Sequence, residues 1–173
     1  MAFNQASFFL FPPGYRPGVE VDESARTASG KPLEIVSPVA EDSTADKILT
    51  ADVSRWFADR GFSEKERYGA IRILQRNPIT TPVGTLGEIE LYLPLEEEAI
   101  EVLYLRFLLT KNTPASIPGW QDLVAELGHD FGLRLMDDDH QLLPGIDFLS
   151  VLAGNENFRA FQDNFGWKIG PGS

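Results

Sequence analysis

The clearest helical pattern in the chain lies in the segment PGWQDLVAELGHDFG at 118–132. Its apolar residues recur at three- and four-residue intervals, which place side chains on one face of a helix. Pro118 suits the first turn of such a helix and Gly132 suits its end. The residues of this stripe, which we expect to face the core, are Trp120, Leu123, Val124, Leu127 and Phe131.

Three further helices are predicted from weaker patterns. One covers 51–60, with Thr50 as its N-cap and Gly61 as a left-handed stop. The other two are short, follow Pro144 and are separated at Gly154 and Asn155. In the last of them Phe158, Phe161 and Phe165 recur at helical spacing, which indicates a buried stripe.

Alternation and short apolar runs predict the strands. ASFFLF at 6–11 indicates a buried strand, and GEIELYLPL at 87–95 alternates apolar and polar residues, as a half-buried strand does. AIEVLYLRFLL at 99–109 fits a buried helix or a central strand, and we favour a strand that forms an antiparallel hairpin with the preceding one. Short strands are also predicted at 68–75, after a helical turn at Ser63 and Glu66, and at 133–137.

The region 13–46 is rich in Gly, Pro, Ser, Thr and charged residues. It is predicted to be a long irregular connection with one edge strand at 33–39. Taken together, the pattern predicts a single α+β domain over 1–173, with a mostly antiparallel sheet and helices packed on one face.

Charge and composition narrow the classes of function. The net charge is −11, and residues 86–150 account for most of it, with thirteen acidic side chains against three basic ones. Such a surface argues against nucleic-acid binding, which depends on Lys and Arg, and favours a basic protein partner.

No apolar stretch is long enough to span a membrane, and SFFLF at 7–11 is too short for a signal peptide, so a cytoplasmic location is expected. The sequence leaves the oligomeric state open.

The segment MDDDH at 136–140 is the strongest candidate for metal chemistry, because Asp and His ligate divalent metals. In an extended chain, however, Asp137 and Asp139 point away from Asp138 and His140. The spacing also fails the calcium-loop pattern, so we interpret the segment as a charged turn before a helix, and no cofactor is predicted. The alternative is a small metal-dependent hydrolase that uses Asp137, Asp139 and His140 or His129.

No catalytic motif stands out, which favours a non-enzymatic binding protein. WQDLVAELGHDFGLRLMDDD and NFRAFQDNFGW, within 118–167, resemble small acidic bacterial immunity-like proteins that bind secreted toxins. The resemblance implies a protein-binding role in a bacterium and no shared catalytic residues. A structural subunit of a larger bacterial assembly is a further alternative. The residues that we predict to contact a basic partner are Glu96, Glu97, Glu98, Glu101, Asp137, Asp138, Asp139 and Trp167.

Overall fold

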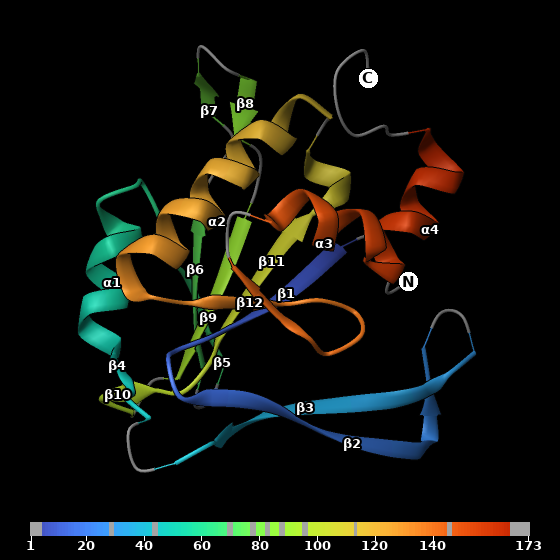
Figure 1. Cartoon of the computed structure of the whole chain (residues 1–173). Coiled ribbons are helices and arrows are strands. Elements are labelled where there is room, and N and C mark those ends of the chain that lie inside the picture. The colour runs from blue at the N-terminus through green and yellow to red at the C-terminus, as the bar shows by residue number, and fades with distance from the viewer. Residues whose placement is uncertain are drawn as a thin grey trace.

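An antiparallel sheet forms the centre of the computed structural model, with the strand order β13-β12-β1-β11-β9-β6-β5 (Figure 1). The structure describes residues 5–27, 30–42, 45–68, 71–76, 79–81, 84–86, 89–94, 97–112, 114–144 and 147–166. Every pair of neighbouring strands in this sheet is antiparallel. The strands are β1 (Gln5–Phe11), β5 (Ser63–Tyr68), β6 (Ile71–Arg76), β9 (Ile89–Pro94), β11 (Leu103–Leu108), β12 (Arg134–Met136) and β13 (Leu142–Pro144).

Three smaller two-stranded sheets accompany the central one. The longest joins β2 (Tyr15–Arg26) to β3 (Pro32–Ala40), and we call it the β2–β3 ribbon. The second joins β4 (Ile48–Leu49) to β10 (Ala99–Ile100), and the third joins β7 (Ile79–Thr81) to β8 (Gly84–Leu86).

The helices are α1 (Thr50–Ala58), α2 (Ile117–Phe131), α3 (Phe148–Gly154) and α4 (Glu156–Phe165), with short 3-10 helices at Leu109–Lys111 and Pro114–Ser116. In Figure 1, α2 and α3 lie in front of the central strands, on the face where the apolar side chains of the sheet point. The α+β class, with a mostly antiparallel sheet and helices on one face, is therefore confirmed.

An aromatic cluster joins the sheet to the helices. The ring of Phe107 on β11 lies 5.6 Å from that of Phe8 on β1, 4.6 Å from that of Trp120 on α2 and 5.5 Å from that of Phe148 on α3. All four side chains are buried. Because aromatic rings bury large areas and favour these tilted and edge-on contacts, the cluster fixes the two helices on the sheet.

The helix stripe predicted for 118–132 is confirmed: Trp120, Leu123, Val124 and Leu127 are buried, and Phe131 packs against the core. Gly132 adopts a φ of +66°, and the amide of Leu133 donates to the carbonyl oxygen of Gly128. This arrangement ends the helix with a left-handed residue, as the sequence predicted.

At α1 the predicted stop is confirmed and the predicted cap is wrong. Gly61 has a φ of +87°, and the amide of Phe62 donates back to Phe57, a contact typical of a left-handed helix end. Thr50 is the first residue of the helix, and Leu49 stands at the N-cap position without a side-chain cap. The hydroxyl of Thr50 instead donates to the carbonyl oxygen of Glu97, at 2.7 Å, so tertiary contact replaces the local cap.

The strands predicted at 6–11, 87–95 and 133–137 are confirmed within the described residues, and the ambiguous run at 99–109 is a strand. It pairs with β9, with Tyr104 opposite Tyr92, so the predicted hairpin is also confirmed. The helical turn predicted at Ser63 is wrong, because Ser63–Tyr68 pairs with β6 as an edge strand of the sheet. Backbone pairing to a neighbouring strand overrides the weak local preference for a cap.

The long irregular connection predicted over 13–46 is also wrong. Its edge strand at 33–39 exists as β3, but the twelve-residue strand β2 pairs with it along most of its length. Pro17, in the part predicted to be irregular, lies directly opposite Pro38, in the predicted edge strand. A proline pair can occupy a position where no hydrogen bond joins the two strands, so neither ring interrupts the ribbon.

Two glycine substitutions test the assignment of the end of α2. Gly132→Ala should lower the free energy of unfolding by about 1 kcal/mol, because an L side chain is strained at positive φ. Gly154→Ala is the matched control, since a Cβ added at the end of α3 would meet no atom within 4 Å. It should leave stability unchanged or raise it by about 0.5 kcal/mol. Equal losses in urea denaturation of the two variants would contradict the assignment.

Candidate protein-binding surface

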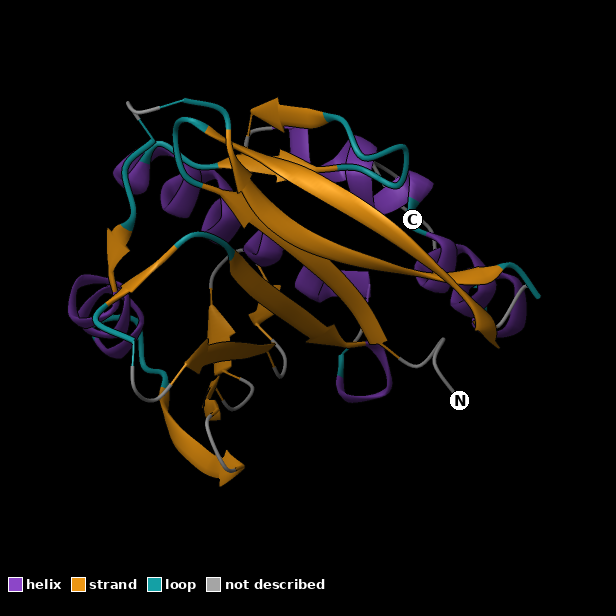
Figure 2. Cartoon of the chain, turned by 90° about the horizontal axis from the view of Figure 1, so that it is seen from below, coloured by secondary structure: helices purple, strands orange, loops and turns teal. Residues whose placement is uncertain are grey.

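The β2–β3 ribbon lies below the central sheet and shares no strand with it (Figure 1). Seen from below, the ribbon lies nearest the viewer and runs along the molecule to its margin (Figure 2). Its register is regular from Tyr15 opposite Ala40 to Asp22 opposite Leu33, and a bulge follows between Asp22 and Arg26. The ribbon is therefore a long, mostly regular element attached to the body near its base.

The ribbon exposes apolar side chains. Among the described residues, five large apolar side chains are exposed, and four of them lie on the ribbon. These four have exposed fractions of 39% (Val19), 54% (Val21), 39% (Leu33) and 49% (Ile35), and the fifth is Leu49 on β4 at 55%. Exposed apolar groups gathered on one element mark an interaction site more often than scattered ones do.

The register divides these apolar residues between the two faces of the ribbon. Val19 and Val21 share a face with Tyr15, which is buried, whereas Ile35 and Leu33 lie opposite Glu20 and Asp22 on the other face. Along the outer part of the ribbon these four side chains are exposed on both faces, and the 137–140 turn contacts the Val19–Val21 face at Glu34. The body of the molecule therefore buries only the base of the ribbon.

Acidic side chains accompany the apolar ones on β2. Glu20 and Glu23 are exposed, and Asp22 is half-buried. The hydroxyl and the amide of Ser24 donate to a carboxylate oxygen of Asp22, at 2.5 and 2.9 Å. These two bonds lower the pKa of Asp22, so its carboxylate is negatively charged at neutral pH. This part of the ribbon combines exposed apolar groups with negative charge.

The acidic segment 137–140 forms a tight turn, as its favoured interpretation predicted. A carboxylate oxygen of Asp137 accepts from the amides of Asp139 and Gln141, both at 2.9 Å, and His140 adopts a φ of +61°. The turn joins β12 to β13, however, and not to a helix, because Leu142–Pro144 pairs back along β12. The short strand β13 was not predicted from the sequence.

The remaining side chains of this turn contact neighbouring elements. Asp138 accepts from the amide of Glu156, at 2.8 Å, at the start of α4, and desolvation raises its pKa. Nε2 of His140 lies 2.5 Å from a carboxylate oxygen of Glu34 on β3, which holds the turn beside the ribbon. Among the described residues, no group of three or more His, Asp or Glu side chains is arranged to hold a metal ion. Asp137 and Asp138 thus have structural contacts, and Asp139 is exposed.

The second predicted acidic segment lies elsewhere. Glu97 and Glu98 are exposed, and their carbonyl oxygens accept from Thr50 at the start of α1. Glu101 forms an ion pair with Lys47, at 3.0 Å, next to β4. The 97–101 segment thus lies beside α1 and β4, whereas 137–140 lies beside β3 and α4, so the structure does not join them into one patch (Figure 1). Glu96 and Trp167 lie outside the described residues.

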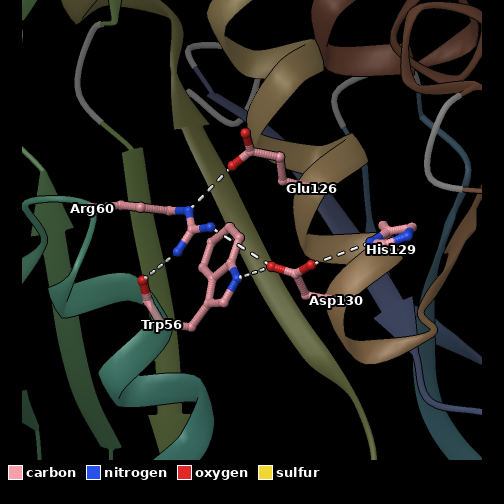
Figure 3. Close-up of polar contacts among 5 residues, drawn as sticks. All are labelled: Trp56, Arg60, Glu126, His129 and Asp130. Carbon is pink, nitrogen blue, oxygen red and sulfur yellow. Dashed lines mark hydrogen bonds and ion pairs between the residues drawn. The ribbon is translucent and has the colours of Figure 1, made fainter.

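A polar network links α1 to α2 around Trp56 (Figure 3). The indole Nε1 donates to a carboxylate oxygen of Asp130, at 2.7 Å, and the guanidinium of Arg60 lies over the indole ring, 3.5 Å from its centre. Arg60 also contacts Glu126, at 3.3 Å, and Asp130, at 3.7 Å. The contacts with Trp56, His129 and Arg60 lower the pKa of Asp130, the indole bond having the largest effect. The sequence pattern did not predict this network.

His129 does not form a catalytic arrangement with this network. Its Nδ1 lies 3.3 Å from the adjacent Asp130 carboxylate, and its side chain is 89% exposed. A general base needs a held orientation and a substrate within reach, whereas this ring projects into solvent from the last turn of α2. The position is that of a solvated histidine at a helix C-terminus.

The face of the sheet opposite the helices carries a paired polar cluster. Arg106 on β11 donates two hydrogen bonds to Glu90 on β9 and lies over the ring of Tyr92, and Tyr104 donates to Ser7, at 2.8 Å. Glu90 is only 2% exposed, although it lies on the polar side of an alternating strand. Because the charges and hydroxyl groups pair within the cluster, it is a structural feature of the sheet.

In comparisons with known proteins, no protein-family model, curated protein or solved structure matches the chain. Within the part of the chain that the structure describes, no helix has the length and apolar character needed to cross a membrane. Among the described features, the exposed apolar side chains of the β2–β3 ribbon are the best indication of a binding surface.

The Trp56 network gives a pH-dependent prediction. Because folding lowers the pKa of Asp130, its charged form stabilises the folded state at neutral pH, and this contribution is lost as the pH falls below about 4. Asp130→Asn should therefore be less stable than the wild type at pH 7 and approach it at low pH, in urea denaturation at each pH. Asp139→Asn, which removes an exposed charge, controls for net charge. A difference between Asp130→Asn and the wild type that does not change with pH would refute this role.

Proposed function

We propose that this chain is a non-enzymatic protein-binding module that contacts its partner through the β2–β3 ribbon. The observation that supports the proposal is the concentration of exposed apolar side chains on that one element, at Val19, Val21, Leu33 and Ile35. Removing such groups from water on binding stabilises a complex in proportion to the apolar area buried. The two-sided exposure favours a partner that encloses or extends the ribbon.

The partner that we propose is a basic protein. Glu20, Asp22 and Glu23 line the apolar strip, and Asp139 is exposed on the turn that packs beside β3. The overall charge of −11 would attract a positively charged surface and raise its rate of association. The sequence resemblance adds the proposal of an immunity-type inhibitor in a bacterial cytoplasm.

Substitutions on the ribbon test this proposal. Tagged wild-type chain, Val21→Asp and Ile35→Asp should be used to capture proteins from the native cell, with quantitative mass spectrometry of what each retains. The wild-type chain should retain a basic protein, and each substitution should lower its recovery about tenfold, because it buries a charge at an apolar contact.

Leu49→Asp is the matched control, since Leu49 is equally exposed but lies on β4, beside the acidic 97–101 segment. This variant should recover the partner as well as the wild-type chain does. Loss of the partner with Leu49→Asp and its retention with the ribbon variants would move the binding surface to the 97–101 segment. Failure of the wild-type chain to retain any protein would contradict the binding function.

The electrostatic part of the proposal has its own test. The association rate of the captured partner with the wild-type chain should fall about tenfold between 0.05 and 0.5 M salt, about the range in which surface charges become screened. The double variant Glu20→Gln and Asp22→Asn should show a flatter dependence in the same stopped-flow measurement. A wild-type rate that is independent of salt would exclude charge steering.

A further inference from the structure

The ribbon has two strand edges that pair with no other strand among the described residues. In an antiparallel pair, the backbone N–H and C=O groups of alternate residues point toward the partner strand, and those of the residues between them point outward. Whether an edge can accept another strand depends on which residues point outward. The local hydrogen bonds identify these residues.

The hydrogen bonds at the base of the ribbon show which residues point toward the partner strand and which point outward. The amide of Glu41 donates to the carbonyl oxygen of Gly14, at 2.8 Å, so this pair is hydrogen-bonded across the ribbon. The amide of the next residue, Tyr15, instead donates outward to Pro12, at 3.2 Å. Continuing the register places the Pro17–Pro38 pair among the outward-pointing positions, which suits two residues that have no N–H. The outward positions that follow on β2 are Val19 and Val21.

The two edges differ in how they are protected. On β3, Pro38 occupies an outward position, Pro32 begins the strand, and the 137–140 turn contacts Glu34. Prolines and covering turns are the usual means by which proteins block an edge. On β2, Val19 and Val21 follow Pro17 with intact N–H groups, and no backbone bond from either one to another element is present in the described chain. The edge of β2 is thus the one open to pairing.

Side chains along this edge specify what a strand added there must carry. Neighbours across a strand pair share a face, so residues beside Val19 and Val21 meet apolar groups and those beside Glu20 and Asp22 meet carboxylates. A second copy of the chain suits this segment poorly, because antiparallel pairing of β2 with itself centred on Glu20 or Val21 brings Glu20 against Glu20 or Asp22. Like charges placed directly opposite destabilise a strand pair.

We propose that the partner binds by adding an extended strand of alternating apolar and basic residues to the edge of β2 at Val19–Val21. This inference rests on the proposed protein-binding function and specifies its geometry. Backbone hydrogen bonds supply the attachment, and the alternation of side chains supplies the selectivity.

A synthetic peptide tests the chemistry of the occupant. Acetyl-Val-Lys-Val-Arg-Val-Lys-Val-amide should shift the amide resonances of Val19 and Val21 in the full-length, isotope-labelled chain and slow their hydrogen exchange. The same peptide with glutamate in place of its basic residues, and one with alternate amides N-methylated, should bind at least about tenfold more weakly. Equal binding of all three peptides would overturn the proposal.

Proline substitutions test the edge itself. Val19→Pro removes an outward N–H without breaking a bond inside the ribbon, so it should fold and bind the peptide at least about tenfold more weakly. Val36→Pro is the matched control, because Val36 is paired with Val19 and points outward on the other edge. Its affinity should stay within about twofold of the wild-type value. Equal affinities of the two proline variants would overturn the assignment to β2.

Charge reversal keeps the proposal testable if Val19→Pro fails to fold. The double variant Glu20→Lys and Asp22→Lys should reverse the preference and bind the glutamate peptide better than the basic one. An unchanged preference would overturn the proposed pairing, as would a concentration-dependent dimer of the wild-type chain that Val19→Pro abolishes.

The two proposals can fail separately. If partner capture requires Val21 and Ile35 but neither peptide binding nor Val19→Pro has an effect, the protein-binding function stands and strand addition is wrong. If the ribbon substitutions leave partner capture intact, the proposed binding surface is wrong as well.

Discussion

The packing of Phe107 against Phe8, Trp120 and Phe148 is the contact on which the rest of the structure depends. It joins two central strands, the longest helix and the helix that follows the β12–β13 hairpin, although these elements lie far apart in the sequence. Since an antiparallel sheet with one apolar face must bury that face, the four rings fix which side the helices cover. The opposite face of the sheet carries the Glu90–Arg106 pair, together with Tyr92 and Tyr104.

The β2–β3 ribbon takes no part in that core beyond its base. Tyr15 is buried there, but the outer residues leave Val19, Val21, Leu33 and Ile35 exposed. A two-stranded ribbon has no buried layer of its own, so its apolar residues add little to the stability of the isolated chain. We interpret their exposure as a property of the binding surface, which the proposed partner would cover.

Local sequence predicted helices better than it predicted sites. The stripe from Trp120 to Phe131 and the left-handed glycines at the helix ends were readable because they depend on contacts within a few residues. Glu90 was placed on the correct side of its strand, but its burial depends on Arg106, sixteen residues away on the neighbouring strand. The link between Trp56 and Asp130 spans still more of the chain and left no periodic signal.

By itself, the sequence determined the α+β class, the main helices, most central strands and the turn at Asp137, because hydrophobic periodicity and turn chemistry are local. Only the tertiary structure decided that the proline-rich segment 13–46 is a ribbon, since a proline fits a strand only where its missing N–H would point away from the partner strand, as at Pro17 and Pro38. It also separated Glu97, Glu98 and Glu101 from Asp137, Asp138 and Asp139, which composition had grouped into one acidic region. Net charge is a sum over the chain, whereas a binding surface depends on which side chains the fold brings together.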